Sequence, residues 1–241
     1  MVRVAVIIPC YNESSSVLPL FDELKSIVFP EKYQVVPIFI DDCSRDNTLQ
    51  VLLDHQLSHL ALPVNLGIGG AVQTGIKYAY RNGFDYAVQM DGDGQHPPFE
   101  LQKIIDELEK GEADLVIGSR FIGDKSFRSS FMRRRGIGML SGLINLLSGV
   151  RILDCTSGYR GFNCKAMALA ADYYPDEYPE PESIIYFSSN GLKIKEISVL
   201  MRERQGGSSS IYGWKSVYYM LKVSLAMIFN YLKHRNAHAS H

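Results

Sequence analysis

Long hydrophobic runs are missing from this sequence of 241 residues. Apolar residue types make up 46% of it, enough for the core of one large domain. Even so, no stretch reaches the roughly 18 to 20 continuous apolar residues that span a bilayer. The apolar run near the N-terminus ends at Pro9 and is too short for the hydrophobic part of a secretory signal. We therefore expect a cytoplasmic protein.

A charge excess of either sign is also missing, because the formal net charge is −1. A protein without a global positive field is not expected to bind nucleic acid as its main partner. Cysteine is scarce as well, and the four cysteines form neither a CxxC pair nor a zinc-binding spacing: Cys10, Cys43, Cys155 and Cys164. This pattern predicts reduced thiols in a cytosolic setting.

Strand-like and helix-like segments alternate through the first half of the chain. Short apolar runs rich in β-branched residues predict strands at Val4 to Ile8, Val35 to Ile40, Tyr86 to Met90 and Leu115 to Ile117. Helical spacing and capping residues predict helices at Ser14 to Val28, Asp46 to Leu53, Gly69 to Asn82 and Pro98 to Lys110. Such alternation predicts a doubly wound α/β fold with a mostly parallel sheet.

The second half of the chain is less regular. A basic stretch, Arg128 and Arg133 to Arg135, precedes an expected apolar helix over Met139 to Leu147. A loop rich in proline and glutamate, Tyr174 to Glu182, is followed by one more helix–strand pair up to Val199. The last hydrophobic segment runs from Trp214 to Leu232. We divide the chain into a domain over 1–210, a hydrophobic or amphipathic helix over 211–235 and a disordered tail over 236–241.

Polar clusters follow three of the predicted strands. They are Pro9 to Glu13, Asp41-Asp42 and Asp91-Gly92-Asp93. In open α/β sheets, ligands bind just beyond the carboxyl ends of the strands, so these carboxylates can converge on one crevice.

The Asp91-Gly92-Asp93 turn has the chemistry of a cation site. Two carboxylates separated by one glycine can meet a single divalent ion, and hard oxygen ligands suit Mg²⁺ or Mn²⁺. Such an ion bridges the phosphates of a nucleotide diphosphate and neutralises charge on the departing group. The alternative is an ordinary Asp-Gly turn between two elements.

The run from Met90 to Pro98, MDGDGQHPP, resembles the DxDxQHPPE-type signature of family 2 glycosyltransferases, and most closely their dolichol- and polyprenyl-phosphate glycosyl synthase branch. Further motifs of that branch follow the same order: PCYNE from Pro9, DDCSRDNT from Asp41, NLGIGGAVQTG from Asn65, GSRF from Gly118 and DCTSGYRGF from Asp154. The likeness covers about residues 2 to 210.

This resemblance implies a GT-A fold and an inverting displacement on a nucleotide diphosphate sugar. It assigns Pro9, Tyr11, Glu13 and Asp42 to the nucleoside, and Arg120 and Arg202 to the donor phosphates, which a guanidinium pairs with well. Asp91, Asp93 and Gln95 match the metal and diphosphate ligands, and we count Asp93 among the catalytic residues.

The glycines at Gly67, Gly69 and Gly70 do not complete a dinucleotide-binding fingerprint, because Val72 stands where its third glycine is needed. We expect Gly67 to let a loop pass close to the nucleotide, or simply to open the following helix.

The nature of the acceptor stays open. Glu180 and Glu182 stand where enzymes that glycosylate sugar hydroxyls keep a catalytic base, which such an acceptor requires. A lipid phosphate is already anionic and needs positive charge instead, which Arg133 and Arg160 could supply. Both arginines could equally belong to a solvated basic surface. A scaffold that only binds nucleotides is the alternative of another class, and the intact Asp91, Asp93 and Gln95 argue against it.

The C-terminal segment has apolar residues on all sides at helical spacing, among them Trp214, Leu221 and Leu225. A helix of this kind must be covered. We expect it to lie on the inner face of the cell membrane, to pack on its own domain or to form a homo-oligomer interface.

Overall fold

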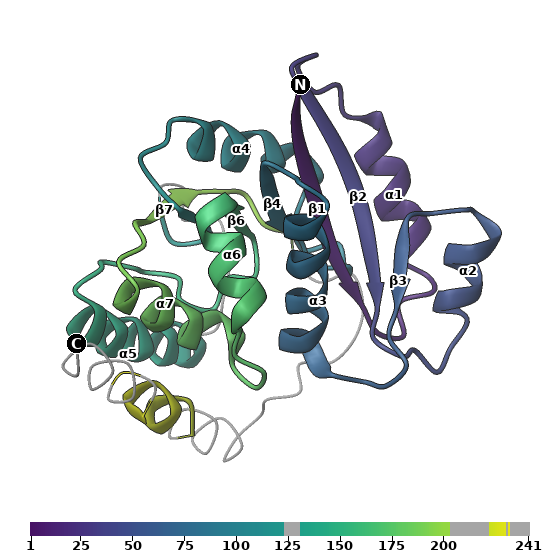
Figure 1. Cartoon of the computed structure of the whole chain (residues 1–241). Helices are drawn as coiled ribbons and strands as arrows, with labels where there is room; N and C mark the ends of the chain where they lie inside the picture. The colour runs from purple at the N-terminus through teal and green to yellow at the C-terminus, as the bar shows by residue number, and fades with distance from the viewer. Residues whose placement is uncertain (123–130, 203–221, 230, 232–241) are drawn as a thin grey trace.

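A mixed sheet lies at the centre of the computed structural model, which describes residues 1–122, 131–202, 222–229 and 231, with only the backbone for 131–134 (Figure 1). Across these residues the sheet has seven strands in the order β3-β2-β1-β4-β6-β5-β7. Neighbouring strands are parallel except where β6 is involved, which runs antiparallel to both β4 and β5. The strands are β1 (Val2–Cys10), β2 (Tyr33–Asp41), β3 (His59–Ala61), β4 (Tyr86–Gln89), β5 (Leu115–Ser119), β6 (Arg160–Asn163) and β7 (Ile194–Ser198).

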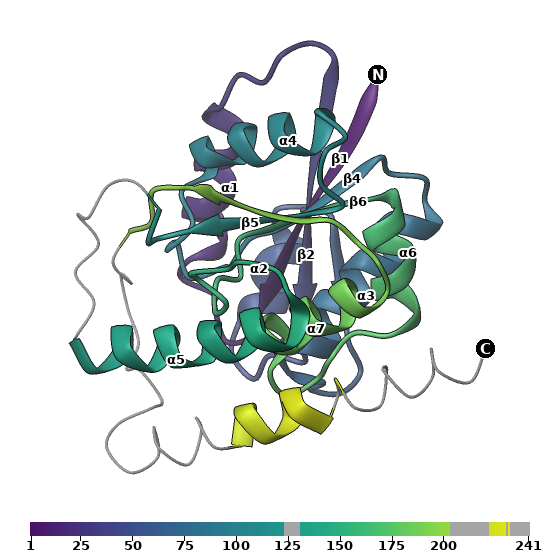
Figure 2. The same ribbon diagram turned by 90° about the vertical axis from the view of Figure 1, so that its left-hand side faces the viewer.

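Helices cover both faces of the sheet (Figures 1 and 2). One apolar cluster joins one face to α1, α2 and α4, and a second joins the other face to α3, α5, α6 and α7. The helices are α1 (Val17–Ser26), α2 (Thr48–Asp54), α3 (Gly67–Arg81), α4 (Leu101–Glu109), α5 (Phe131–Ser148), α6 (Cys164–Asp172) and α7 (Pro179–Ser189), and a 3₁₀ turn, η1 (Pro98–Glu100), precedes α4.

The central strands are apolar because both of their faces are covered. The side chains of Val4 to Ile8 are fully buried, with alternate residues in the two clusters. Helix α3 packs closely on this strand at Gly75, where an added Cβ would lie 2.3 Å from Ile7. These contacts hold the carboxyl ends of β1 and β2 in place beneath the loops that follow them.

The predicted doubly wound α/β fold with a mostly parallel sheet is confirmed. The segment from Tyr174 to Glu182 was expected to be a loop, but its last residues form the first turn of α7. Proline fits the first helical turn, because it has no N–H group to leave unsatisfied there. The apolar helix expected from Met139 begins earlier, at Phe131, and β6 and α6 are additional elements.

The C-terminal segment is described only in part. Residues 222–229 are helical, and Val223 and Met227 are fully buried in the same cluster as α5 and α7. Leu225 and Phe229 face outward, 55% and 68% exposed. Trp214, Leu221 and Leu232 lie outside the described residues. None of the helices in the described ranges has the length and apolar character needed to cross a bilayer.

Candidate active site

The ends of β1, β2 and β4 meet where the strand order reverses. Strand β1 has β2 on one side and β4 on the other, so the loops after these strands lie together. The N–H group of Asp42 donates to the carbonyl oxygen of Cys10 (2.9 Å), and that of Glu13 donates to the hydroxyl of Thr48 (2.8 Å). A reversal of this kind is where doubly wound folds bind their ligands.

The residues expected to meet the nucleoside surround this point. Pro9 is buried at the end of β1, whereas Tyr11 is exposed just beyond it. Glu13 is half-buried and its carboxylate accepts a hydrogen bond from the hydroxyl of Ser16. Tyr11 therefore has the open ring surface that a base needs for stacking.

Asp42, expected at the nucleoside, is bonded to the backbone at the start of α3. Its carboxylate is buried and accepts hydrogen bonds from the backbone N–H groups of Leu66 (2.7 Å) and Gly67 (2.9 Å). Burial raises the pKa of Asp42, and these two hydrogen bonds partly offset that effect. Gly67 opens α3 with a positive φ of 76°. In this conformation Asp42 holds the start of α3 in place.

The Asp91-Gly92-Asp93 turn follows β4 after one residue, Met90. An added Cβ at Gly92 would lie 3.1 Å from the carbonyl oxygen of Pro9, so the turn packs on the end of β1. The carboxylate of Asp93 accepts a hydrogen bond from the backbone N–H of Gln95 (3.0 Å) and a second from its side chain. The side chain of Asp91 is 35% exposed, so its oxygens are open to a ligand.

A buried histidine, His96, is hydrogen-bonded to the first residue of this turn. His96 accepts a hydrogen bond at Nδ1 from the backbone N–H of Asp91 (2.9 Å), and its ring stacks on Tyr159 with 4.7 Å between centroids. Burial lowers the pKa of His96, although Asp91 and Asp93 act in the opposite direction. A neutral ring suits this position, since Nδ1 must keep a lone pair to accept the hydrogen bond.

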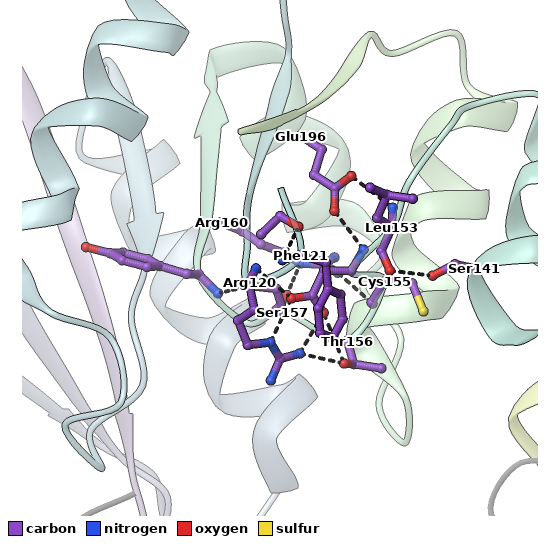
Figure 3. Close-up of polar contacts among 12 residues, drawn as sticks. Arg120, Phe121, Ser141, Leu153, Cys155, Thr156, Ser157, Arg160 and Glu196 are labelled. Carbon is purple, nitrogen blue, oxygen red and sulfur yellow. Dashed lines mark hydrogen bonds and ion pairs between the residues drawn. The ribbon is translucent and has the colours of Figure 1, made fainter. Parts of the chain in front are cut away.

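Arg120, expected at the donor phosphates, lies at the end of β5 in a buried ion pair (Figure 3). Its Nε and one terminal nitrogen donate to the two carboxylate oxygens of Asp154 (2.7 and 2.6 Å), and the same nitrogen reaches Thr156 (2.8 Å). Burial opposes the charge on Arg120, but the bonds to Asp154 outweigh it and raise its pKa. Glu196 on β7 accepts from the backbone N–H groups of Leu153 (2.9 Å) and Asp154 (2.7 Å) and so holds this segment from the other side.

Arg160 does not have the exposed position that acceptor binding needs, and this corrects our expectation. It is fully buried, and its guanidinium donates to the carbonyl oxygens of Ser157 (2.7 Å) and Cys155 (3.2 Å), residues that Figure 3 shows beside it. It also donates to the hydroxyl of Ser183 (2.7 Å). These bonds join the start of β6 to α7, so the role that the structure gives to Arg160 is to fix that junction.

The two glutamates at the start of α7 differ in their surroundings. Burial raises the pKa of Glu180, the charge of Arg160 lowers it, and Asp91 raises it further. The charge of Glu182 instead affects Tyr173, whose pKa is raised mainly by burial and to a smaller extent by Glu182. Of this pair, Glu180 is therefore the one whose pKa responds to the charges of Arg160 and Asp91.

The side chains of the remaining candidate arginines either have another partner or lie outside the described residues. The guanidinium of Arg202 donates to both carboxylate oxygens of Glu23 (2.7 and 2.6 Å), while its backbone N–H donates to the carbonyl oxygen of Gln95 (2.9 Å). Arg133 belongs to α5, and its side chain lies outside the described residues. Within the described ranges, no group of three or more histidine, cysteine, aspartate or glutamate side chains could hold a metal ion.

The fold thus gathers Asp91, Asp93, Gln95, Arg120 and Glu180 around one end of the sheet. Sequence reasoning missed Asp154, His96 and Glu196, which position these groups. The first two stand inside recognised motifs, so their place in the motif was the available signal. Glu196 stands in a strand and gave no such signal.

Comparison with known proteins finds a family profile, named relatives and solved structures that are similar to this chain. The profile of Glycosyl transferase family 2 matches residues 5–169. The UDP-N-acetylglucosamine–dolichyl-phosphate N-acetylglucosaminyltransferase of Methanococcus voltae is 27% identical over 93% of this chain and 97% of its own. The polyprenol monophosphomannose synthase of Mycolicibacterium smegmatis is 30% identical over 92% and 86%. Glucosyl-3-phosphoglycerate synthase of Mycobacterium tuberculosis, solved with Mn²⁺ and UDP, is similar in fold, with a TM-score of 0.65 and 17% identity over 96% of this chain and 79% of that one.

Proposed function

Because the chain belongs to glycosyl transferase family 2 and is a glycosyltransferase, we propose that it moves a sugar from a nucleotide diphosphate donor to a polyprenyl phosphate. The observation that carries this proposal is the match with relatives named for a dolichyl-phosphate acceptor and a polyprenol product along 86% or more of their length. UDP- and GDP-sugars both remain candidates for the donor.

The Asp91 turn fits a divalent cation, Mg²⁺ or Mn²⁺. Asp91, Asp93 and Gln95 offer side-chain oxygens of the kind these ions prefer, and the Asp91 carboxylate is partly exposed. A cation bound there supplies positive charge that stabilises the diphosphate as it leaves. The similar fold solved with Mn²⁺ and UDP supports a site of this kind.

The protein's own side chains bind and orient the donor in this proposal. The base and ribose lie against Tyr11, Pro9 and Glu13, beside the loop that Asp42 and Gly67 hold in place. The charge of Asp91 helps to raise the pKa of Arg120, after the larger effect of Asp154, and this supports a role of Arg120 near the diphosphate. Arg202 reaches the diphosphate only if it exchanges its bonds to Glu23 for bonds to phosphate.

A lipid phosphate needs no base, because its oxygen is already anionic when it attacks the anomeric carbon. The attack opposite the departing diphosphate inverts the configuration at that carbon. Arg133, in the basic first turn of α5, is our proposed contact for the acceptor phosphate. The burial of Arg160 leaves it out of this role.

The acceptor class can be tested with Glu180→Gln and Glu182→Gln. With a short-chain polyprenyl phosphate as acceptor, we expect both variants to keep most of the wild-type rate, since no proton has to be removed. Arg133→Ala should raise the acceptor KM while the donor KM stays unchanged. Initial rates with a panel of nucleotide sugars measure these effects, and Lys165→Ala serves as the control for a loss of positive charge at α6.

Transfer to a sugar hydroxyl is the second candidate. The observation that favours it is Glu180 at the start of α7, whose pKa is raised mainly by burial and also by the charge of Asp91. A carboxylate of raised pKa is a stronger base. If Glu180→Gln loses about 10²–10⁴-fold in rate while nucleotide binding is preserved, general base catalysis is required and the lipid-phosphate proposal is wrong.

We also propose that the protein contacts the cytoplasmic face of a membrane through α5 and residues 222–229. Both lie on the same side of the molecule (Figures 1 and 2), and their outward-facing apolar side chains are Met139, Leu146, Leu225 and Phe229. An acceptor carried by a lipid supports this placement, and apolar side chains on an interfacial helix enter the boundary of the bilayer.

Flotation with anionic liposomes tests this membrane contact. The double variant Leu225→Glu/Phe229→Glu should lower the bound fraction several-fold, because two charges would enter the apolar boundary. Val28→Glu is the matched control, because the exposed Val28 follows α1, across the sheet from α5. Equal binding by the double variant and wild type contradicts the proposal. If light scattering finds a dimer that the double variant abolishes, this surface is instead an interface between two copies.

A further inference from the structure

Gln89, the last residue of β4, has a buried side-chain amide without the hydrogen bonds that usually accompany burial. Its side chain is 0% exposed, and neither its amide nitrogen nor its amide oxygen has a hydrogen-bond partner among the described residues. A buried polar group without a partner costs free energy, and native structures contain few of them. An amide with both atoms unsatisfied therefore points to a hydrogen bond that forms in another state of the protein, such as a complex with a ligand.

The unpaired amide lies next to Asp91. A Cβ added to Gly158 would be 3.0 and 3.2 Å from the two carboxylate oxygens of Asp91, and 3.2 Å from Nε2 of Gln89. The carboxylate and the amide therefore border the same small space, and a side chain at position 158 would crowd both of them. The Asp91 carboxylate has no hydrogen bond to another side chain within the described ranges, so it can still accept one from this side.

The neighbouring buried groups have their partners elsewhere. Arg160 is paired with Gln89 in the register of β4 and β6, but its guanidinium donates to Ser157, Cys155 and Ser183. His96 accepts a hydrogen bond from the backbone N–H of Asp91, and its Nδ1 lies 3.7 Å from a carboxylate oxygen of Asp91, too far for a hydrogen bond. Asp91 is thus the nearby charged group for which the Gln89 amide is the natural donor.

We infer that Gln89 is a positioning residue for Asp91: its Nε2–H group donates to the Asp91 carboxylate when the donor complex forms. The inference rests on the proposed function, in which Asp91 binds a divalent cation and the donor diphosphate. A carboxylate that binds a cation through one oxygen is held in place by a hydrogen bond to the other, and loss of such a bond weakens metal affinity or activity about 10–100-fold. Gly158 keeps the approach between the two groups open.

The first test uses the protein without cation or nucleotide. Gln89→Met has nearly the same shape and no amide, so it removes two unsatisfied atoms from the interior. We expect its Tm to be higher than that of wild type by roughly 2–6 °C. Val88 is the adjacent buried residue, and its side chain packs in the apolar cluster that contains α1, α2 and α4. Val88→Ala should instead lower the Tm, because it leaves a cavity.

The second test measures Mn²⁺ binding by electron paramagnetic resonance in the presence of UDP and, separately, of GDP. Gln89→Met should bind Mn²⁺ about 10–100-fold more weakly than wild type, whereas Val88→Ala should bind it equally well. A variant that is more stable and yet binds the cation less tightly cannot be explained by a merely structural role.

Two results overturn the inference. A lower Tm in Gln89→Met shows that the amide already has a structural partner, and unchanged Mn²⁺ affinity shows that it does not position Asp91. If wild type itself binds no Mn²⁺ with either nucleotide, the proposed metal dependence fails and this inference fails with it. If wild type binds Mn²⁺ and Gln89→Met binds it equally, only the role of Gln89 is wrong.

Discussion

Asp93→Ala and Asp91→Ala should each lower the rate of sugar transfer at least about a hundredfold, because they remove the carboxylates proposed to hold the cation at the leaving diphosphate. The rate should be measured with Mg²⁺ and with Mn²⁺, using the nucleotide sugar that the wild-type enzyme accepts. Adding EDTA to wild type should produce a loss of similar size.

Asp85→Ala is the matched control, since Asp85 stands at the opposite end of β4 and accepts a hydrogen bond from the backbone N–H of Arg3 (2.7 Å). It should keep nearly the full rate once the protein is folded. Full turnover by Asp93→Ala in the presence of EDTA would falsify the proposed metal dependence.

Asp154→Ala should destabilise the fold more than any of the other single substitutions. It removes the buried carboxylate that pairs with Arg120 through two hydrogen bonds, and breaking a buried ion pair costs about 3–5 kcal/mol. For a chain of this size the Tm should fall by about 10 °C or more. Calorimetry or circular dichroism measures this effect.

The exposed ion pair between Lys32 and Glu109 provides the comparison, because Glu109→Ala should lower the Tm far less than Asp154→Ala does. The double variant Arg120→Met/Asp154→Leu should regain part of the lost stability, since it removes both charges together. It should stay inactive if Arg120 also contacts the donor phosphates. Equal Tm values for Asp154→Ala and Glu109→Ala would show that burial adds nothing to the pair.

The first half of the fold was predictable because its signals are local. The buried strand Val4 to Ile8 is apolar at every position, and Gly83 and Gly111 stand just after the ends of α3 and α4. Strand β6, Arg160–Asn163, has no such signal: it contains a charged residue, a glycine and an asparagine, which rarely favour a strand. It is a strand because β4 and β5 offer it hydrogen-bond partners on both sides.

The location of the site was predictable, but the burial and the hydrogen-bond partners of its side chains were not. The carboxyl ends of parallel strands converge in any doubly wound fold, so Asp42 and Asp91 were expected to lie close together. The sequence could not reveal that Asp42 would be held by the N–H groups of Leu66 and Gly67, or that Arg160 would be buried. Charged residues are normally exposed, and the exceptions depend on partners that are distant in the chain.

The Arg120–Asp154 pair joins the two ends of one long segment. Residues 121–153, including most of the length between β5 and β6, begin and end at this single contact. Because β6 runs antiparallel to β5, the chain enters β6 at the same end of the sheet at which it left β5. The segment can therefore change in length without altering the order of the strands, provided that α5 keeps the apolar residues that pack in the core. Exchanging residues 121–153 between related enzymes should transfer the preference for an acceptor while the donor preference stays with the recipient.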